Sequence, residues 1–165
     1  NKEELAQPKH RGDTINEIYR EDIFVGYRWA DKEKIKPLFP FGHGLSYTTF
    51  AYGKPSADKK TMTADDAISF TVNVKNTGKY DGEEVSQLYM RDEYASVVQP
   101  MKQLKHFERF HLKKGEEKKV TFVLTEEDFF LVNYTLKKVV ESGTFQVMIG
   151  SSSDDIRLEK SISVE

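Results

Sequence analysis

Apolar and polar residues alternate with a period of two in several short segments, and this alternation is the feature that most constrains the fold. It is clearest in residues 68–75 and recurs at residues 120–125 and 144–149. Successive side chains of a strand point to opposite faces, so the pattern indicates strands with one buried and one solvated face. Residues 84–90 carry apolar side chains on both faces, which is typical of a central strand.

Turn-forming residues separate these segments at regular intervals, and together they define about seven short strands. This arrangement predicts an all-β, immunoglobulin-like sandwich of two sheets. Residues 104–112 predict a strand with a bulge, residues 113–116 a hairpin-like turn, and residues 125–128 a single helical turn. The expected core comprises Phe70, Val72, Val85, Leu88, Phe122, Leu124, Phe145, Val147 and Ile149.

Composition changes along the chain and divides it into three parts. Residues 1–22 are polar and charged, and we expect a flexible lead-in. Residues 23–66 form a connector, and residues 67–165 form the sandwich. Within the connector, the β-branched and aromatic run Ile23–Trp29 predicts a short strand.

The connector contains a segment, residues 38–50, that is irregular and yet rich in aromatic side chains; we call it the strap. Its proline and two glycines exclude a helix and disfavour a long strand. We expect the glycines to adopt positive φ at sharp reversals and the apolar side chains to be buried against the sandwich. The strap would thereby dock the sandwich onto neighbouring domains through Phe39, Phe41, Gly42, Gly44, Leu45, Tyr47 and Phe50.

Charge and cysteine content exclude several classes of protein. The 165 residues contain 25 Lys and Arg against 27 Asp and Glu, for a net charge of −2. This near-neutral balance excludes a strong, uniform basic surface for binding nucleic acid. No apolar run approaches the roughly 20 residues needed to span a bilayer. The absence of Cys excludes a disulfide scaffold. The chain begins at Asn1 without Met, which favours a piece of a larger protein.

No catalytic, metal or cofactor motif stands out. His106 and His111 are five residues apart and should fall on opposite faces of a strand, which disfavours a shared metal. Adjacent carboxylates such as Glu83–Glu84 and Asp154–Asp155 are expected to be solvated rather than placed across a cleft. Asn133 begins a glycosylation sequon that matters only in a eukaryotic secretory setting. We therefore expect no catalytic residue, no metal and no cofactor in this chain.

Four ordered blocks of sequence resemble the C-terminal part of glycoside hydrolase family 3 enzymes, the β-glucosidases and β-xylosidases. They are IFVGYRW with PLFPFGHGLSYTTF (residues 23–50), VKNTGKYDGEEVSQLY (74–89), QPMKQLKHFERFHLKKGE (99–116) and GTFQVMIGSSSDDI (143–156). The resemblance implies a fibronectin type III-like sandwich that follows two catalytic domains. The family's nucleophile and acid/base residue belong to those other domains, and no residue here matches either motif.

The resemblance thus implies a noncatalytic accessory domain of an enzyme that hydrolyses terminal β-linked glucose or xylose, with the catalytic domains of the same polypeptide as partners. A bacterial source is implied, and a periplasmic or secreted location is favoured over a cytoplasmic one. Two alternatives stay open: an oligomerisation domain, and a carbohydrate-binding module that tethers oligo- or polysaccharide. The second requires exposed aromatic side chains, for which Tyr80, Tyr89, Tyr94 and Tyr134 are candidates.

Overall fold

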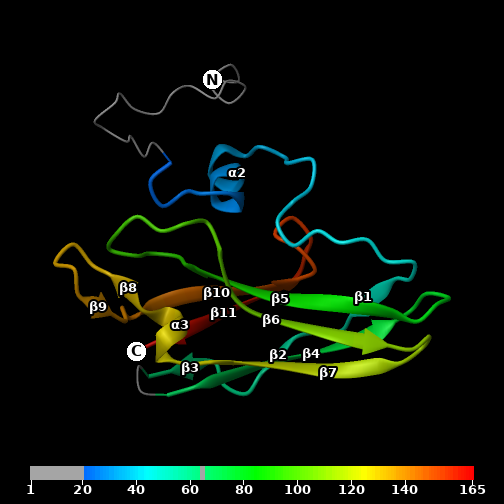
Figure 1. The fold of residues 1–165 in the computed structure, drawn as a ribbon. Coiled ribbons are helices and arrows are strands. Elements are labelled where there is room, and N and C mark those ends of the chain that lie inside the picture. Colours follow the sequence, from blue (N-terminus) through cyan, green and yellow to red (C-terminus); the bar gives the residue numbers. More distant parts are fainter. Residues whose placement is uncertain (1–20, 64–65) are drawn as a thin grey trace, which may run out of the picture.

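The computed structural model describes residues 21–63 and 66–165 and shows two facing sheets with a short helix above them (Figure 1). In the first sheet, β4 (Ile68–Asn76) pairs on one side with β1 (Phe50–Tyr52) and β2 (Ser56–Ala57), and on the other with β7 (Glu117–Leu124). The second sheet has the order β3 (Thr61–Met62), β11 (Ile156–Val164), β10 (Gly143–Gly150), β5 (Gly82–Asp92) and β6 (Gln103–Leu112). The expected all-β sandwich is confirmed.

The inner faces of the two sheets form one hydrophobic core. Alternate residues of β4 and β7 are buried, as their period-two patterns predict. β10 places Phe145, Val147 and Ile149 in the core, but Met148 is also buried, on its other face. Eight of the nine expected core residues are buried there, the exception being Val85. Val85 lies on the outer face of β5, opposite Arg109 of β6, because inward-facing positions of β5 are the even-numbered ones such as Leu88 and Met90.

β5 is a central strand whose two faces are both covered, as the sequence predicts. Leu88 faces the core, whereas Tyr89 is fully buried on the outer face. The expected bulge is also present in the neighbouring β6. Leu88 pairs with His106 and Tyr89 with Leu104, so Lys105 is the extra residue.

The prediction of a strand at residues 23–29 is wrong. The structure instead forms the helix α2 (Tyr27–Glu33), which follows Gly26 at a φ of 64° and ends at Lys34 in the left-handed region. Strand propensity expresses how well a side chain fits a pleated, half-buried surface, and in the described part of the chain this segment pairs with no strand of either sheet. Tyr27 is the first residue of this helix, and its ring packs edge-on against that of Tyr89, with the ring centroids 6.0 Å apart.

Two further details differ from the sequence analysis. The turn at residues 113–116 exists, with Glu116 N–H bonded to the Lys113 carbonyl, but it does not close a hairpin. β6 and β7 belong to opposite sheets, so the chain crosses between layers there. The sheets also begin at Phe50, ahead of residue 67, because β1 and β2 pair with β4 and β3 pairs in parallel with β11.

The remaining elements lie at one end of the sandwich. The expected helical turn is α3 (Glu126–Phe129), where the Thr125 N–H donates to the Asp128 carboxylate at 2.9 Å. β8 (Leu131–Val132) and β9 (Lys138–Val139) form a small separate hairpin. Within the described part of the chain, no helix is long and apolar enough to cross a membrane. Most of the lead-in expected at residues 1–22 lies outside the described residues.

Candidate docking surface

The connector crosses the outer face of the second sheet before it enters the first. α2 lies over β5 and β6, where the Tyr27 hydroxyl accepts the Leu104 N–H at 2.9 Å and Asp31 pairs with Lys102 at 2.8 Å. The strap then continues along the same side of the molecule towards β1 (Figure 1). The connector therefore covers part of this face and is not a free linker.

A buried amide holds the first half of the strap. The Gln87 side chain of β5 donates to the backbone oxygens of Ser151 (2.6 Å) and Gly42 (3.4 Å), and it accepts the Tyr89 hydroxyl at 2.6 Å. The Ser153 N–H adds a 2.9 Å bond to the backbone oxygen of Phe41. These bonds tie the strap to the loop between β10 and β11, so its backbone has a fixed position.

Glycine is required at one of the two strap positions where we expected positive φ. Gly42 has a φ of 80°, and a Cβ there would lie closer than 3.0 Å to the Gln87 amide. Gly44 does not have positive φ, and a Cβ there would meet no atom within 4 Å. The expectation is therefore met at Gly42 and wrong at Gly44.

The second half of the strap is anchored at the turn between β4 and β5. The Thr48 hydroxyl donates to the Asn76 side-chain oxygen at 2.6 Å, and the Thr77 N–H donates to the Thr49 backbone oxygen at 2.8 Å. Phe50 then packs against the core. The strap is thus attached to the sandwich at residues 41–42 and 48–50, through backbone groups, buried polar groups and the Phe50 ring.

The apolar side chains before and between these anchors point away from the sandwich, contrary to our expectation that the sandwich would bury them. Leu45 and Tyr47 are 92% and 96% exposed, and Leu38 and Phe39 are also largely exposed. Phe41 is only partly covered, by stacking on Tyr27 with ring centroids 4.9 Å apart. Backbone hydrogen bonds hold the strap here, so its side chains remain available for another surface.

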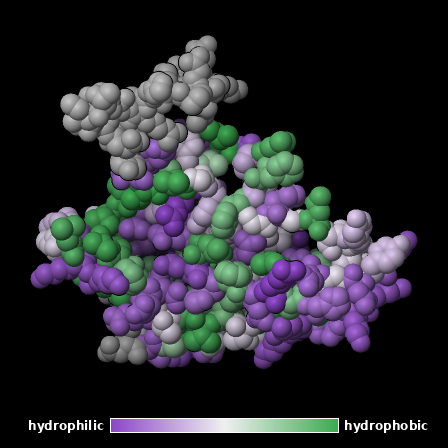
Figure 2. Space-filling view, in the orientation of Figure 1, coloured by the Kyte–Doolittle hydropathy of each residue, from purple (hydrophilic) through white to green (hydrophobic). Residues whose placement is uncertain are grey.

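This exposed surface is also free of charge. Residues 37–53 contain no Asp, Glu, Lys or Arg. In Figure 2, hydrophobic colour is present on the upper side of the molecule, where the connector runs. A contiguous group of exposed, uncharged, apolar side chains is characteristic of the core of a protein–protein contact.

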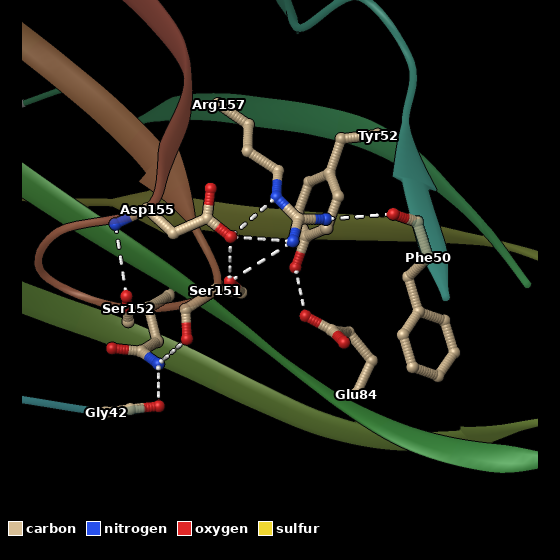
Figure 3. Close-up of polar contacts among 9 residues, drawn as sticks. Gly42, Phe50, Tyr52, Glu84, Ser151, Ser152, Asp155 and Arg157 are labelled. Carbon is tan, nitrogen blue, oxygen red and sulfur yellow. Dashed lines mark hydrogen bonds and ion pairs between the residues drawn. The ribbon is translucent and has the colours of Figure 1, made fainter. Parts of the chain in front are cut away.

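A second network closes the edge of the sandwich beside the strap (Figure 3). Arg157 of β11 donates to the Asp155 carboxylate at 2.7 Å and to the backbone oxygen of Phe50 at 2.9 Å. Its guanidinium lies over the Tyr52 ring, 4.7 Å from the centroid. The Tyr52 hydroxyl in turn donates to Glu84 at 2.8 Å. Since β11 and β1 belong to different sheets, this network links the two layers.

Burial and neighbouring charges shift the pKa values of the ionisable groups in this network, some upward and some downward. Burial raises the pKa of Tyr52 well above its ordinary value of 10.0, and the neighbouring Glu84 carboxylate adds to the effect. Burial also raises the pKa of Glu84 above 4.5, against the opposing influence of Tyr52 and Arg157. The hydrogen bond from Arg157 lowers the pKa of Asp155 below 3.8.

Glu84→Gln is expected to stabilise the chain at neutral pH. Because the folded-state pKa of Glu84 is raised, the folded chain binds this proton more tightly than the unfolded chain and loses stability as pH rises above 4.5. Glutamine removes the ionisation, and its amide oxygen can still accept the Tyr52 hydroxyl. In urea unfolding from pH 4 to pH 8, the advantage of the variant should grow with pH. Glu83→Gln, at the exposed adjacent position, is the control; an advantage that shrinks with rising pH would contradict this account.

The remaining sequence candidates have local structural roles. His106 pairs with Asp128 at 2.9 Å and faces the core side of β6, whereas His111 lies on the opposite face, as expected. Glu83 pairs with Arg109, and Asp155 pairs with Arg157. The described residues contain no group of three or more His, Asp or Glu side chains that could hold a metal ion.

Sequence reasoning missed Gln87 and Arg157, which organise the two networks. A detectable signal existed for Gln87, because an amide inside a strand with two buried faces must find hydrogen-bond partners. No local pattern marks Arg157, whose partner Phe50 is distant in sequence.

Residues 84–153 match the model of the fibronectin type III-like domain family. The chain is 49% identical to β-glucosidase BoGH3A of Bacteroides ovatus over 93% of its own length and 20% of that protein. It is 50% identical to a β-xylosidase of Formosa agariphila over 79% of its length and 18% of that protein.

A solved β-glucosidase of Kluyveromyces marxianus shares the fold, with a TM-score of 0.82 and 45% identity over 90% of this chain and 18% of that one. The chain therefore spans about a fifth of the length of the proteins it matches.

Proposed function

Because the chain belongs to the fibronectin type III-like domains that glycoside hydrolase family 3 β-glucosidases and β-xylosidases contain, we propose that it is the C-terminal accessory domain of such an enzyme. The whole enzyme would hydrolyse terminal β-linked glucose or xylose by a retaining route with two carboxylates. This domain would supply neither carboxylate. Its role would be to dock onto the catalytic domains of the same polypeptide and hold them in place.

The exposed strap carries this proposal. Its backbone is fixed to the sandwich by Gln87 and Thr48, while the side chains of Leu45 and Tyr47 point outward from a segment without charge. A preformed apolar surface binds with little loss of conformational entropy. The relatives are about five times as long as this chain, so most of each relative's sequence lies outside the matched segment. In the proposed enzyme, that part of the polypeptide would provide the partner surface.

The double substitution Leu45→Ser with Tyr47→Ser tests the docking role in two contexts. In this chain alone, both side chains are solvated, so the free energy of unfolding should change by less than about 0.5 kcal/mol. In the full-length enzyme, each loses a burial worth about 1.5 to 3 kcal/mol. We therefore expect a lower thermal midpoint and faster proteolytic release of this domain, with little change in the KM of the remaining folded enzyme.

The comparison between the two contexts is the control. An equal loss in both would mean that the residues support the sandwich itself. Unchanged stability and proteolysis of the full-length enzyme would mean that the strap does not dock, and the proposal would be wrong.

A further inference from the structure

Two tyrosines project from one end of the sandwich, away from the exposed part of the strap. Tyr94 lies in the loop between β5 and β6, and Tyr134 lies at the tip of the β8–β9 hairpin; they are 82% and 85% exposed. Figure 1 shows this loop and the hairpin at the same end of the molecule. The backbone N–H of Ser96 donates to the Glu141 carboxylate at 2.9 Å, which ties the loop to the segment that follows β9.

The backbone beneath each tyrosine is held by a neighbouring polar side chain. The Asp92 carboxylate accepts the Tyr94 N–H at 3.0 Å. The Asn133 side-chain oxygen accepts the N–H groups of Thr135 (2.9 Å) and Lys137 (3.1 Å), and the Thr135 hydroxyl at 2.7 Å. Such Asx turns order a loop without burying its side chains. The aromatic rings are therefore presented from preorganised loops.

The hairpin tip also contains backbone strain. Leu136 has a φ of 60° and an exposed side chain, although a bulky residue rarely adopts this conformation. Asparagine or glycine would avoid the strain, so stability of the hairpin alone does not explain leucine here. Strained residues of this kind gather at sites that bind ligands.

Charge distinguishes this surface from the strap. Glu93 adjoins Tyr94, and Lys137 and Lys138 follow the hairpin tip; all three are exposed. The cores of protein–protein contacts are depleted of such charged residues, as the strap is. Aromatic rings set among charged and hydroxyl groups suit a ligand that has both apolar faces and many hydroxyls. A β-linked pyranose chain has these properties, because its equatorial hydroxyls leave the C–H faces of each ring apolar.

We propose that Tyr94 and Tyr134 form a noncatalytic binding site for β-linked glucan or xylan chains. The choice of sugar rests on the proposed function, whereas the site itself rests on the two tyrosines and their supporting loops. The rings would stack on the faces of the sugars, and Glu93, Thr135 and Lys137 would bond to their hydroxyls. Polymeric substrate would thereby be retained near an enzyme that acts on chain ends.

Affinity electrophoresis of this chain in gels containing soluble mixed-linkage β-glucan or arabinoxylan tests the proposal. We expect the migration of the wild type to be retarded in at least one of these gels and unaffected by pullulan, an α-linked glucan. Tyr94→Ala and Tyr134→Ala should each weaken binding by about tenfold, within the range for loss of one aromatic contact. Tyr80→Ala, at an exposed tyrosine elsewhere, is the matched control and should bind as the wild type does.

Absence of retardation by both β-linked polymers would overturn the proposal, as would equal weakening by the control substitution Tyr80→Ala. If Tyr94→Ala and Tyr134→Ala instead loosen domain docking in the full-length enzyme without affecting glycan binding, the surface contacts protein and the proposal is wrong. The docking role of the strap is tested separately by Leu45→Ser with Tyr47→Ser, so either proposal can fail without the other.

Discussion

Phe145→Ala is expected to lower the free energy of unfolding of this chain by about 3 to 5 kcal/mol. Phe145 is buried on β10 between the two sheets, and its ring packs edge-on against Phe129 at a centroid distance of 5.1 Å. Truncation removes this contact and leaves a cavity that the flanking strands cannot close. A loss of this size approaches the whole stability of a small domain. Urea unfolding monitored by circular dichroism measures it.

Val123→Ala is the matched control for Phe145→Ala. Val123 lies on β7, but its side chain points outward and is about half exposed, at 49%. Truncating Val123 should change the free energy of unfolding by less than about 1 kcal/mol, because folding buries little of its apolar side chain. A loss below about 1 kcal/mol at Phe145 would show that the assigned core face is wrong.

Gly150→Ala is expected to cost about 1 to 3 kcal/mol and to release the strap. A Cβ on Gly150 would lie closer than 3.0 Å to the backbone of Asp155 and Ile156, so the loop between β10 and β11 must move. That loop supplies the Ser151 oxygen that Gln87 contacts and the Ser153 N–H that holds Phe41. Hydrogen exchange should therefore accelerate in residues 41–49 as well as in the loop.

Gly143→Ala is the matched control for Gly150→Ala, because it lies at the other end of the same strand and a Cβ there would meet no atom within 4 Å. It should leave both stability and strap exchange close to the wild type. If Gly150→Ala lowers stability while exchange in residues 41–49 is unchanged, the loop does not hold the strap.

The strands could be predicted from sequence because their burial is periodic. The alternation in β4 and β7 reports directly which side chains face the core, and the apolar residues on both faces of β5 report its central position. In β10 the core residues Phe145, Val147 and Ile149 follow the same alternation, although Met148 is buried on the other face. Val85 shows the limit of this reasoning. On a strand with two covered faces, an apolar residue can belong to either, and alternation alone does not say which face is the core.

The connector could not be predicted as well, because its structure depends on distant partners. Tyr27 and Trp29 suit a strand by composition, yet the contacts of Tyr27 with Tyr89 and Leu104 arise only after β5 and β6 are paired. The aromatic side chains of the strap indicate that the strap is buried against some surface. The sequence does not say whether that surface belongs to the sandwich or to another domain. The mistaken expectation for Leu45 and Tyr47 came from assigning their burial to the sandwich.

The position of β11 has a consequence for the order of events during synthesis. β11 is the last strand of this chain, but it lies between β3 and β10, and its Arg157 bonds to Phe50 of β1. A nascent chain therefore cannot complete the second sheet, or set the loop that holds the strap, until β11 has left the ribosome. In the proposed enzyme, the catalytic domains synthesised before this chain would fold first. The finished docking surface would therefore form only after Arg157 and the rest of β11 have emerged from the ribosome.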